Sequence, residues 1–377
     1  VDDIFVHDIA EGILLEKVRY GLVTRSRVYD VTSQDEFETS SSWNITFLGD
    51  IARNPGPGNS FYDIYEDSRD ILVAESQGIK TDTKTGIYAV SVGGVSLLPQ
   101  RVTFRDIILT APIPGAQGAG PNPGCFVRGY SIGNGAQDIN IFGGVVQGAC
   151  YDVNSMSVAN DAAGRVKIDG VLFDTSGTAH IRNTRALADL DIRNNTFKDW
   201  GFVNGNTYPS ALDFAAVALA SINLSGNTFK NTLTTKNSYY YINNVAATNI
   251  PFLIDNNIMA GGLASGGSGF ALASYNTGMK FGRNYILGQG ASPSETYPGG
   301  TYGVRTFYTG NTSNAIAHGL GYTPDINSIS LTSLASSAVS GITSMWVSAV
   351  ANTSITISIY PAAAAQFDIA FSIAPQK

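Results

Sequence analysis

Apolar and polar residues follow one eight-residue pattern at seven places in the chain. Position one is always apolar, position three is Phe, Ile or Leu, position five is Asp, Gly, Asn or Arg, and position eight is apolar. The seven copies are VTFRDIIL (Val102 to Leu109), INIFGGVV (Ile139 to Val146), VKIDGVLF (Val166 to Phe173), LDIRNNTF (Leu190 to Phe197), INLSGNTF (Ile222 to Phe229), FLIDNNIM (Phe252 to Met259) and MKFGRNYI (Met279 to Ile286). Apolar residues two apart on a strand point to the same side, and Gly or Asn provides the backbone freedom for a sharp corner. Each copy therefore predicts a strand, a corner and a second strand.

The copies start 37, 27, 24, 32, 30 and 27 residues apart, so the pattern repeats while the connections vary. This is typical of a solenoid in which each coil stacks on the next. Three segments, 111–124, 199–210 and 231–241, interrupt the pattern and are expected to be projecting loops. We therefore expect an all-β solenoid over residues 1–290, with weaker copies such as ITFLGDIA in the first hundred residues.

Stacking the copies places residues of the same position above one another. Position eight forms an interior apolar column, and position six forms a column of Asn whose amides are expected to bond the backbone of neighbouring coils. The two columns are Phe173, Phe197, Phe229 and Met259, and Asn195, Asn227, Asn257 and Asn284. On the outside, Lys167 is expected beside Asp191 and Asp169 beside Arg193, as cross-strand ion pairs. All of these columns predict scaffold rather than chemistry.

The composition excludes several classes of function. The chain has 377 residues, 14% of them charged, and a net charge of −7, so the basic face that nucleic-acid binding requires is not expected. No apolar run approaches the length of a membrane span. Two cysteines and three scattered histidines have no metal-ligand spacing, and we expect no metal, no cofactor and free thiols in a reducing cytoplasm. Because strand-like residues begin at once and no initiator Met is present, we expect an N-terminal portion to be missing.

Two further regions depart from the repeat. The segment GNSFYDIYEDSRD concentrates Asp63 and three other carboxylates and is interpreted as a solvated acidic loop. Residues 291–303 are rich in Gly, Pro and Ser and predict a linker. Beyond it, INSISLTSL, SMWVSAV, SITISIY and FDIAFSIA are spaced like the strands of a small antiparallel sandwich. This sandwich is expected to be a separate domain over residues 304–377, for trimerisation or for receptor binding.

Candidate chemistry lies on the third strand of each coil. Matching Val153, Ile181, Leu212 and Ile242 as inward residues leaves a set of polar neighbours pointing outward. These neighbours include Asp152, His180, Arg182, Asp213 and Tyr241. Carboxylates two coils apart suit the separation used by inverting glycosidases, so Asp152 and Asp213 are a candidate acid and base pair.

Two alternatives remain open for this outward set. Elimination from a uronic acid would use His180 or Tyr241 as the base and Arg182 as the cation that binds the carboxylate. In the third interpretation the set is an ordinary polar face with an ion pair between Arg182 and Asp213. Trp200, Tyr208 and Tyr241 are candidate platforms for sugar rings.

The right-angle corners, the Asn column, the long loops and the terminal β domain together resemble bacteriophage tailspike proteins. The most family-like strings are AHGLGYTPDINSISLTSL (Ala317 to Leu334) and SMWVSAVANTSITISIYPA (Ser344 to Ala362), which resemble a β module that closes many tailspikes and tail fibres. The resemblance implies a right-handed parallel β-helix on the virion tail, assembled as a homotrimer in the host cytoplasm, with an N-terminal virion-attachment domain. The apolar string AAVALAS (Ala215 to Ser221) is a candidate contact between subunits.

The family binds bacterial surface polysaccharide, and many members cleave O-antigen or capsule as endoglycosidases or lyases. It has no shared catalytic motif, so the site residues rest on the stacking of coils alone. The sequence therefore predicts a depolymerase acting by endo-glycosidic cleavage, with a lyase and a non-catalytic adhesin of the same fold as alternatives.

Overall fold

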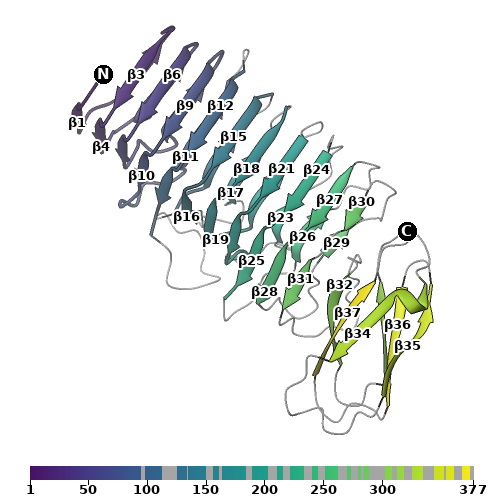
Figure 1. The fold of residues 1–377 in the computed structure, drawn as a ribbon. Coiled ribbons are helices and arrows are strands. Elements are labelled where there is room, and N and C mark those ends of the chain that lie inside the picture. Colours follow the sequence, from purple (N-terminus) through teal and green to yellow (C-terminus); the bar gives the residue numbers. More distant parts are fainter. Residues whose placement is uncertain are drawn as a thin grey trace.

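The computed structural model shows a long stack of parallel strands followed by a small antiparallel domain (Figure 1). It describes residues 1–94, 98–112, 125–133, 135–149, 156–160, 164–183, 189–202, 210–214, 221–232, 240–244, 251–261, 270–272, 279–281, 284–287, 302–307, 312–317, 325–333, 344–351, 354–360 and 367–373. Nearly all regular structure in these residues is strand, and one 3-10 helical turn occurs at Ile326–Ser328. The predicted all-β fold with a parallel solenoid is confirmed.

Three parallel sheets run the length of the solenoid, and each coil contributes one strand to each sheet. The first sheet contains β1 (Phe5–His7), β4 (Arg27–Tyr29), β7 (Ile51–Arg53), β10 (Gln77–Ile79), β13 (Ile108–Thr110), β16 (Val145–Ala149), β19 (Leu172–Ser176), β22 (Thr196–Lys198), β25 (Thr228–Asn231), β28 (Ile258–Gly261) and β31 (Tyr285–Leu287). The second sheet contains β2 (Ile13–Glu16), β5 (Phe37–Ser40), β8 (Ser60–Tyr65), β11 (Tyr88–Gly93), β14 (Arg128–Ile132), β17 (Met156–Asn160), β20 (Ala179–Asn183), β23 (Ser210–Asp213), β26 (Tyr240–Asn244) and β29 (Phe270–Leu272). The third sheet contains β3 (Gly21–Thr24), β6 (Trp43–Leu48), β9 (Arg69–Ala74), β12 (Gln100–Arg105), β15 (Gln137–Phe142), β18 (Val166–Asp169), β21 (Asp189–Arg193), β24 (Ser221–Ser225), β27 (Phe252–Asp255) and β30 (Met279–Phe281).

The eight-residue pattern coincides with the corner between the third and first sheets. Its first position stacks in register from Val102 through Ile139 to Met279, and its last from Leu109 through Val146 to Ile286. Position five has a positive φ wherever it is described, for example 54° at Asn194 and 67° at Gly226. A left-handed residue turns the chain sharply, and Gly, Asn and Asp adopt that conformation at the smallest cost. The pattern therefore encodes the corner as well as the two strands.

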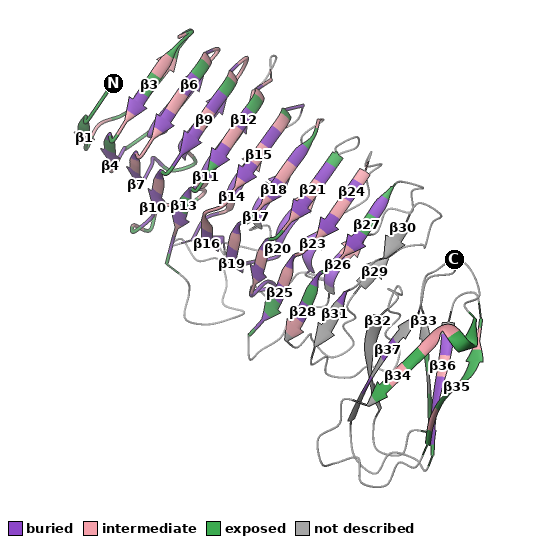
Figure 2. Ribbon diagram, viewed as in Figure 1, coloured by how far each residue is buried: buried purple, intermediate pink, exposed green. Residues whose placement is uncertain are grey.

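The interior columns are also confirmed. The rings of Phe173 and Phe197 stack with centroids 5.2 Å apart, and those of Phe197 and Phe229 with centroids 5.0 Å apart. All three side chains are buried, as is Met259, and they belong to one core that runs through the solenoid (Figure 2). Each coil has only one apolar inward face, so the column is buried only because coils stack.

The Asn column bonds each coil to its neighbours. The Asn227 side-chain oxygen accepts hydrogen bonds from the backbone N–H and the amide of Asn195, at 3.0 and 3.1 Å. Its amide donates to the carbonyl oxygen of Ile192 at 2.9 Å and to the side-chain oxygen of Asn257 at 3.0 Å. The same arrangement continues through Asn257 to Asn284. These amides satisfy backbone groups that the corner would otherwise leave unpaired.

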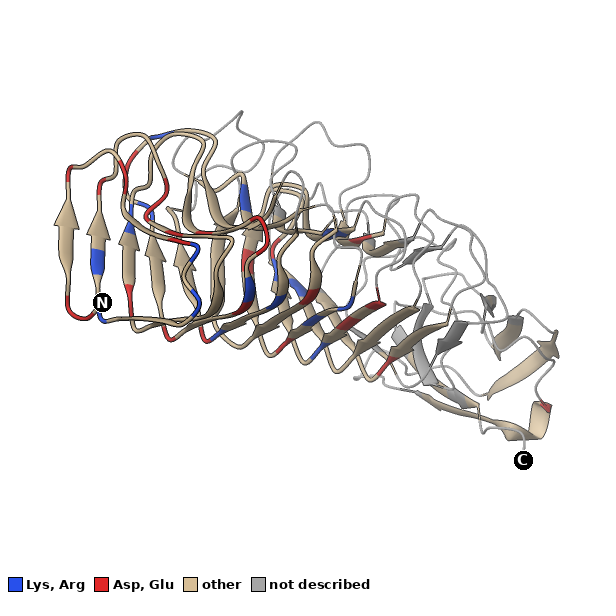
Figure 3. Cartoon of the chain, turned by 90° about the horizontal axis from the view of Figure 1, so that it is seen from above, with Lys and Arg blue, Asp and Glu red and all other residues tan. Residues whose placement is uncertain are grey.

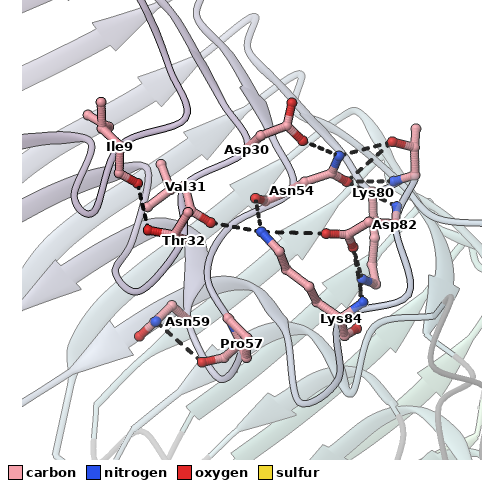
Figure 4. A network of polar contacts seen from close by, with 11 residues as sticks. Ile9, Asp30, Val31, Thr32, Asn54, Pro57, Asn59, Lys80, Asp82 and Lys84 are labelled. Atoms are coloured by element: carbon pink, nitrogen blue, oxygen red, sulfur yellow. Dashed lines mark hydrogen bonds and ion pairs between the residues drawn. The ribbon is translucent and has the colours of Figure 1, made fainter.

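In the N-terminal coils, other polar residues occupy the position that holds Asn in the later coils. Ser26, Asp50 and Ser76 occupy position six, and the Asp50 carboxylate accepts from the backbone N–H of Ser26 at 2.7 Å. A second polar network joins these coils at the connection from the first to the second sheet (Figure 4). There the Asn54 amide donates to Asp30 at 2.7 Å, and the buried Lys80 ammonium donates to Asp82 at 2.7 Å. In this half of the solenoid, charged side chains as well as amides therefore form the hydrogen bonds within and between coils.

Two expectations about individual residues change, one on the outer ion pairs and one on a cysteine. Lys167 does pair in register with Asp191, and Asp169 with Arg193, but the ion pairs join residues of the same strand, such as Lys167 with Asp169 at 3.6 Å. Cys125 is disulfide-bonded, so the expected free thiol is wrong. No helix within the described ranges is long and apolar enough to cross a bilayer.

The C-terminal strands form two antiparallel sheets of three strands each. The order is β32 (Tyr302–Phe307), β37 (Phe367–Ile373) and β34 (Ile329–Ser333) in one sheet, and β33 (Ser313–Ala317), β36 (Ser354–Tyr360) and β35 (Ser344–Val350) in the other. Ile355, Ile357 and Ile359 from β36 pack with Ile369 and Phe371 from β37 in a second core. The two sheets therefore face each other across a common apolar layer, as in a sandwich. Residues 318–324 of the family-like string lie outside the described residues.

Candidate active site on the second sheet

Two consecutive side chains point inward at the second and third residues of most strands of the second sheet. In β20 these are His180 and Ile181, and in β26 they are Tyr241 and Ile242. The register of paired residues skips the first of the two positions in most of these strands, so the alternation of side chains is interrupted there. The first position forms an interior column of Phe61, Ala89, Gly129, Ser157, His180, Ala211 and Tyr241. A simple period of two therefore assigns this position to the wrong side.

The prediction that His180 lies on the outer face is consequently wrong. Its side chain is fully buried beside the rings of Phe197 and Trp200, with centroids 5.7 and 6.3 Å away. The ring nitrogen Nε2 lies 2.9 Å from the carbonyl oxygen of Lys198, so Nε2 carries the proton and Nδ1 accepts from the Ser157 hydroxyl at 3.0 Å. Burial lowers the pKa of His180 to about 3. This histidine is a neutral part of the core.

Two predicted sugar platforms also belong to the core. Trp200 and Tyr241 are fully buried, and their rings pack with centroids 5.5 Å apart. Trp200 follows β22 at a coil connection, and Tyr241 occupies the same inward position as His180. Neither ring can stack on a glycan, and Tyr241 cannot act as a base at the surface. Tyr208 lies outside the described residues.

The predicted partner of Asp213 is not placed. Asp152 lies outside the described residues, and the neighbour of Ile181 in the preceding coil is Val158, not Val153. The count that matched Val153 passed over the insertion before β17. Ile181, Leu212 and Ile242 do align as predicted.

The outward residues of the second sheet form one continuous line of mainly polar side chains. They occupy the same register position on eight neighbouring strands, from β5 to β26. We call this line the outer strip; its members are Glu38, Asp63, Ser91, Ser131, Ala159, Arg182, Asp213 and Asn243. Seven steps of about 4.8 Å give it a length of roughly 34 Å. All of its polar members are half-buried.

Arg182, Asp213 and Asn243 form the C-terminal end of the outer strip. The Arg182 Nε atom lies 3.3 Å from an Asp213 carboxylate oxygen, and the Asn243 amide donates to the other oxygen at 3.1 Å. Burial raises the pKa of Asp213, and Arg182 and the Asn243 hydrogen bond oppose that shift. The predicted ion pair between Arg182 and Asp213 is thus confirmed, and the carboxylate also accepts a hydrogen bond from Asn243.

Glu38 and Asp63 form the N-terminal end and lie directly opposite each other on β5 and β8. Burial raises the pKa of Glu38 to about 7, and the neighbouring carboxylates of Asp35, Glu11 and Glu16 add to the shift. Burial also raises the pKa of Asp63 well above its usual range, with Asp35 and Glu38 adding and a hydrogen bond from Ser91 opposing. One Asp63 oxygen, Oδ1, is buried without a hydrogen-bond partner among the described residues. Two carboxyl groups in this position hold a proton near neutral pH because both cannot ionise at low cost.

Serine hydroxyls and one cation connect the two ends. Ser91 and Ser131 follow Asp63 along the outer strip, and the Arg128 guanidinium donates to the Ser131 hydroxyl at 3.2 Å. Arg128 also lies over the Tyr88 ring, with its central carbon 5.7 Å from the ring centroid. Two serine hydroxyls therefore lie between the ends of the strip, and one of them bonds to a guanidinium beside it.

Sequence reasoning missed Glu38 and Asp63 because it assigned the acidic segment around Asp63 to a loop. Residues Ser60–Tyr65 are strand β8, in which Tyr62 and Ile64 point inward and Asp63 points outward. The alternation Tyr62, Asp63, Ile64 was the available signal. Among described residues, no three His, Cys, Asp or Glu side chains are grouped in a way that could hold a metal ion.

Comparison with known proteins gives similarity of fold only. No family model matches the sequence, and no match among curated proteins was found. The tailspike of Acinetobacter phage vB_ApiP_P1 is similar with a TM-score of 0.44 and 10% identity, over 99% of this chain and 81% of that one. The Gp54 tailspike of Acinetobacter baumannii bacteriophage AP22, in complex with a capsular saccharide, has a TM-score of 0.35 and 9% identity over 96% of this chain and 65% of that one. A tailspike double mutant of E. coli bacteriophage HK620 has a TM-score of 0.35 and 10% identity, over 96% and 76% of the two chains. All three are tailspikes, the class that the sequence resembles.

Proposed function

We propose that this chain is the polysaccharide-binding and depolymerising part of a phage tailspike, and that it cleaves a bacterial surface glycan along the outer strip. The observation that carries the proposal is the strip itself, a line of half-buried carboxyl, hydroxyl, guanidinium and amide groups on seven of eight neighbouring strands. A polymer with regularly spaced hydroxyl groups can hydrogen-bond to successive coils. A small molecule would use only one or two of them.

Glu38 and Asp63 are the proposed acid and base pair. Neighbouring strands are about 4.8 Å apart, which is close to the separation of roughly 5–5.5 Å between the carboxyl groups of retaining glycosidases. The member that holds the proton would donate it to the glycosidic oxygen, and the ionised member would attack the sugar. Attack at the anomeric carbon would form a glycosyl–enzyme bond as the protonated leaving group departs, and water would then hydrolyse that bond and return both carboxyl groups to their starting forms. Cleavage at linkages inside the polymer would be endo-glycosidic.

Asp213 takes a different role in this proposal. Because Arg182 and Asn243 both bind its carboxylate, Asp213 is better suited to orient a sugar or the Arg182 side chain than to transfer a proton. The pairing of Asp213 with Asp152 remains the competing assignment for the catalytic carboxyls. A lyase that uses His180 or Tyr241 as its base is not retained, because both side chains are buried in the core.

The assembly follows from the family resemblance. We propose a homotrimer on the virion tail, joined to the virion by an N-terminal domain. Residues 215–220 of the string AAVALAS (Ala215 to Ser221), which was expected to contact another subunit, lie outside the described residues.

The test measures cleavage of purified surface polysaccharide by the chain and by matched variants. New reducing ends without ultraviolet absorbance of an unsaturated product identify a hydrolase, whereas both together identify a lyase. The double variant Glu38→Gln/Asp63→Asn should lose at least about 100-fold in kcat, because acid–base catalysis contributes about that much or more. Asp213→Asn should mainly raise KM, and Glu75→Gln at an exposed corner of the solenoid should leave both constants unchanged.

The dependence of cleavage on pH is a second test of Glu38 and Asp63. Since Glu38 has a pKa of about 7, cleavage should change with pH near 7, where Glu38 gains or loses its proton, and Glu38→Gln should remove that step from the profile. Full activity in the double variant together with inactivity of Asp213→Asn would assign catalysis to the C-terminal end instead. Binding without any cleavage would leave an adhesin of the same fold.

A further inference from the structure

One set of outward residues on the first sheet forms a second continuous line along the solenoid. These residues occupy the same register position on eight neighbouring strands, from β7 to β28. We call this set the first-sheet line; its members are Ile51, Gln77, Ile108, Val145, Leu172, Thr196, Thr228 and Ile258. Seven steps of about 4.8 Å give it a length of roughly 34 Å. Five of its members are apolar, and none is charged.

The side chains of the first-sheet line point away from the core. The next residue on each strand is buried, as Leu109 and Val146 show, so the members of the line face outward. Ile108 is 39% exposed, Ile258 is 40% exposed, and the other six are half-buried. After residue 22, the described part of the solenoid has one other exposed large apolar side chain, Leu253 at 36%. Apolar side chains gathered on one surface mark a contact with another molecule.

The other two sheets carry charged residues on their outer faces. The second sheet has the carboxyl and guanidinium groups of the outer strip, and on the third sheet Lys167 pairs with Asp169 at 3.6 Å. Lys, Arg, Asp and Glu occur on most coils of the solenoid (Figure 3). On the first sheet they lie beside the line, where the Lys198 ammonium donates to the Asp174 carboxylate at 3.0 Å. An apolar centre with a polar rim is the usual composition of a contact between proteins.

The spacing of the first-sheet line limits what can cover it. A partner needs apolar side chains about every 4.8 Å along a straight line of roughly 34 Å. An α-helix repeats about every 5.4 Å, so after seven repeats it is about 4 Å, or nearly one coil, out of register. A second copy of this solenoid with a parallel axis has the same spacing and offers the same residue at each height. The line therefore fits another copy of the chain better than a helical partner.

We propose that the first-sheet line lies at the centre of the homotrimer and packs against the same line of two further copies. This inference rests on the homotrimer proposed above and names the face that forms it. A three-fold axis parallel to the solenoid keeps each residue at its own height, so Val145 and Leu172 would form apolar layers of three around the axis. The Gln77 amide both donates and accepts, so it would bond to its own counterparts and fix the register of the copies. The outer strip, on the second sheet, would lie outside this contact.

Analytical ultracentrifugation of the full chain measures the effect of a charge on this line. Leu172→Glu would place three carboxylates together at the axis and should raise the dissociation constant of the trimer at least about 100-fold, because like charges that face each other across a contact repel strongly. Leu253→Glu makes the same change at an outward position of the third sheet and should leave the trimer unchanged. Both side chains point outward, so circular dichroism should show the wild-type fold for each variant.

A second variant tests the position of the line even if Leu172→Glu does not fold. Thr196→Cys should form covalent dimers in air-saturated buffer, because a residue at a three-fold axis lies beside its own counterparts. Thr103→Cys, which also points outward but from the third sheet, should give no such dimers on a denaturing gel. The native Cys125 is buried and already disulfide-bonded, so it does not contribute to these dimers.

The outcomes separate this inference from the proposals on which it rests. A Leu172→Glu trimer as tight as the wild type would overturn the first-sheet line as the contact and leave the homotrimer intact. Dimers of Thr103→Cys without dimers of Thr196→Cys would overturn it as well and place the third sheet at the axis. A monomeric wild type would contradict the homotrimer itself. Cleavage of polysaccharide is measured in its own assay, so the proposed depolymerase is judged independently of all three results.

Discussion

Two polar columns run along this solenoid, one inside and one outside, and their side chains are satisfied to different degrees. In the interior, every polar atom of the Asn227 side chain has a hydrogen-bond partner in a neighbouring coil. On the outer strip, Glu38 and Asp63 face each other as two acids, and one Asp63 oxygen lies buried without a partner among the described residues. The interior column lowers the free energy of the fold, whereas the outer pair raises it.

This difference distinguishes scaffold from site. In a column where each polar group hydrogen-bonds to the next coil, no donor or acceptor remains for a ligand. Carboxyl groups whose pKa is raised by burial and by other acids keep protons and acceptor capacity for a substrate. Side chains that are unfavourable in the free protein are common at active sites.

The largest stability effect is expected from the interior column. Asn227→Ala leaves the carbonyl of Ile192 and the backbone N–H of Asn195 without their side-chain partners, and we expect it to cost about 3 kcal/mol in free energy of unfolding. The control is Asn223→Ala, on the third-sheet strand of the same coil, where the side chain points outward and bonds to Asp191. Asn223→Ala should cost less than about 1 kcal/mol. If urea unfolding gave equal losses of unfolding free energy for the two variants, the Asn column would contribute no more to stability than an outward hydrogen bond.

An intermediate effect that depends on pH is expected at His180. The pKa of this residue is about 3 in the folded chain and near 6.5 in the unfolded chain, so between these values only the unfolded state binds the proton. The contribution of His180 to stability therefore falls as the pH decreases from about 6.5 toward 3. His180→Asn should cost about 2 kcal/mol near pH 7.5, and nearly all of that difference should disappear near pH 4.5.

The measurement at His180 is urea unfolding of both proteins at the two pH values. A destabilisation by His180→Asn that is the same at both would mean that the histidine titrates normally and lies at the surface. In that case His180 would again be a candidate base for a lyase. Cleavage by the folded variant should remain within about threefold of the wild type.

The smallest effect, and one of opposite sign, is expected on the outer strip. Glu38 has a folded pKa of about 7 and an unfolded pKa near 4.5, so the folded state binds the extra proton between these values and loses stability as the pH rises through them. Glu38→Gln should therefore stabilise the chain slightly near pH 8, by less than about 1 kcal/mol after allowing for solvent screening, and not at all near pH 4.5. Glu16→Gln should show no such gain, because Lys17 lowers the pKa of Glu16. A loss of stability in Glu38→Gln at pH 8 would mean that the ionised carboxylate has a favourable partner and that the pair is scaffold.

Much of the solenoid could be predicted from residue order alone. The eight-residue pattern located the strands of two sheets, the left-handed residue at the corner, the Phe column and the Asn column. It succeeded because these features arise within a few consecutive residues, and because a repeated unit must present the same side chain at the same place in each coil. The order of residues also indicated the change to antiparallel strands after the solenoid.

Only the tertiary structure decided which side chains of the second sheet face outward. His180 and Tyr241 were expected on the surface and are buried, because two consecutive residues turn inward near the start of these strands. Trp200, at a coil connection, is buried beside them. Connections of variable length precede this sheet, so its register cannot be counted from the repeat, and a one-residue error moves every side chain to the opposite face. Glu38 and Asp63 are 25 residues apart in sequence, and they become neighbours only because β5 pairs with β8. The sequence determined the coil, and the stacking of coils determined which acids meet.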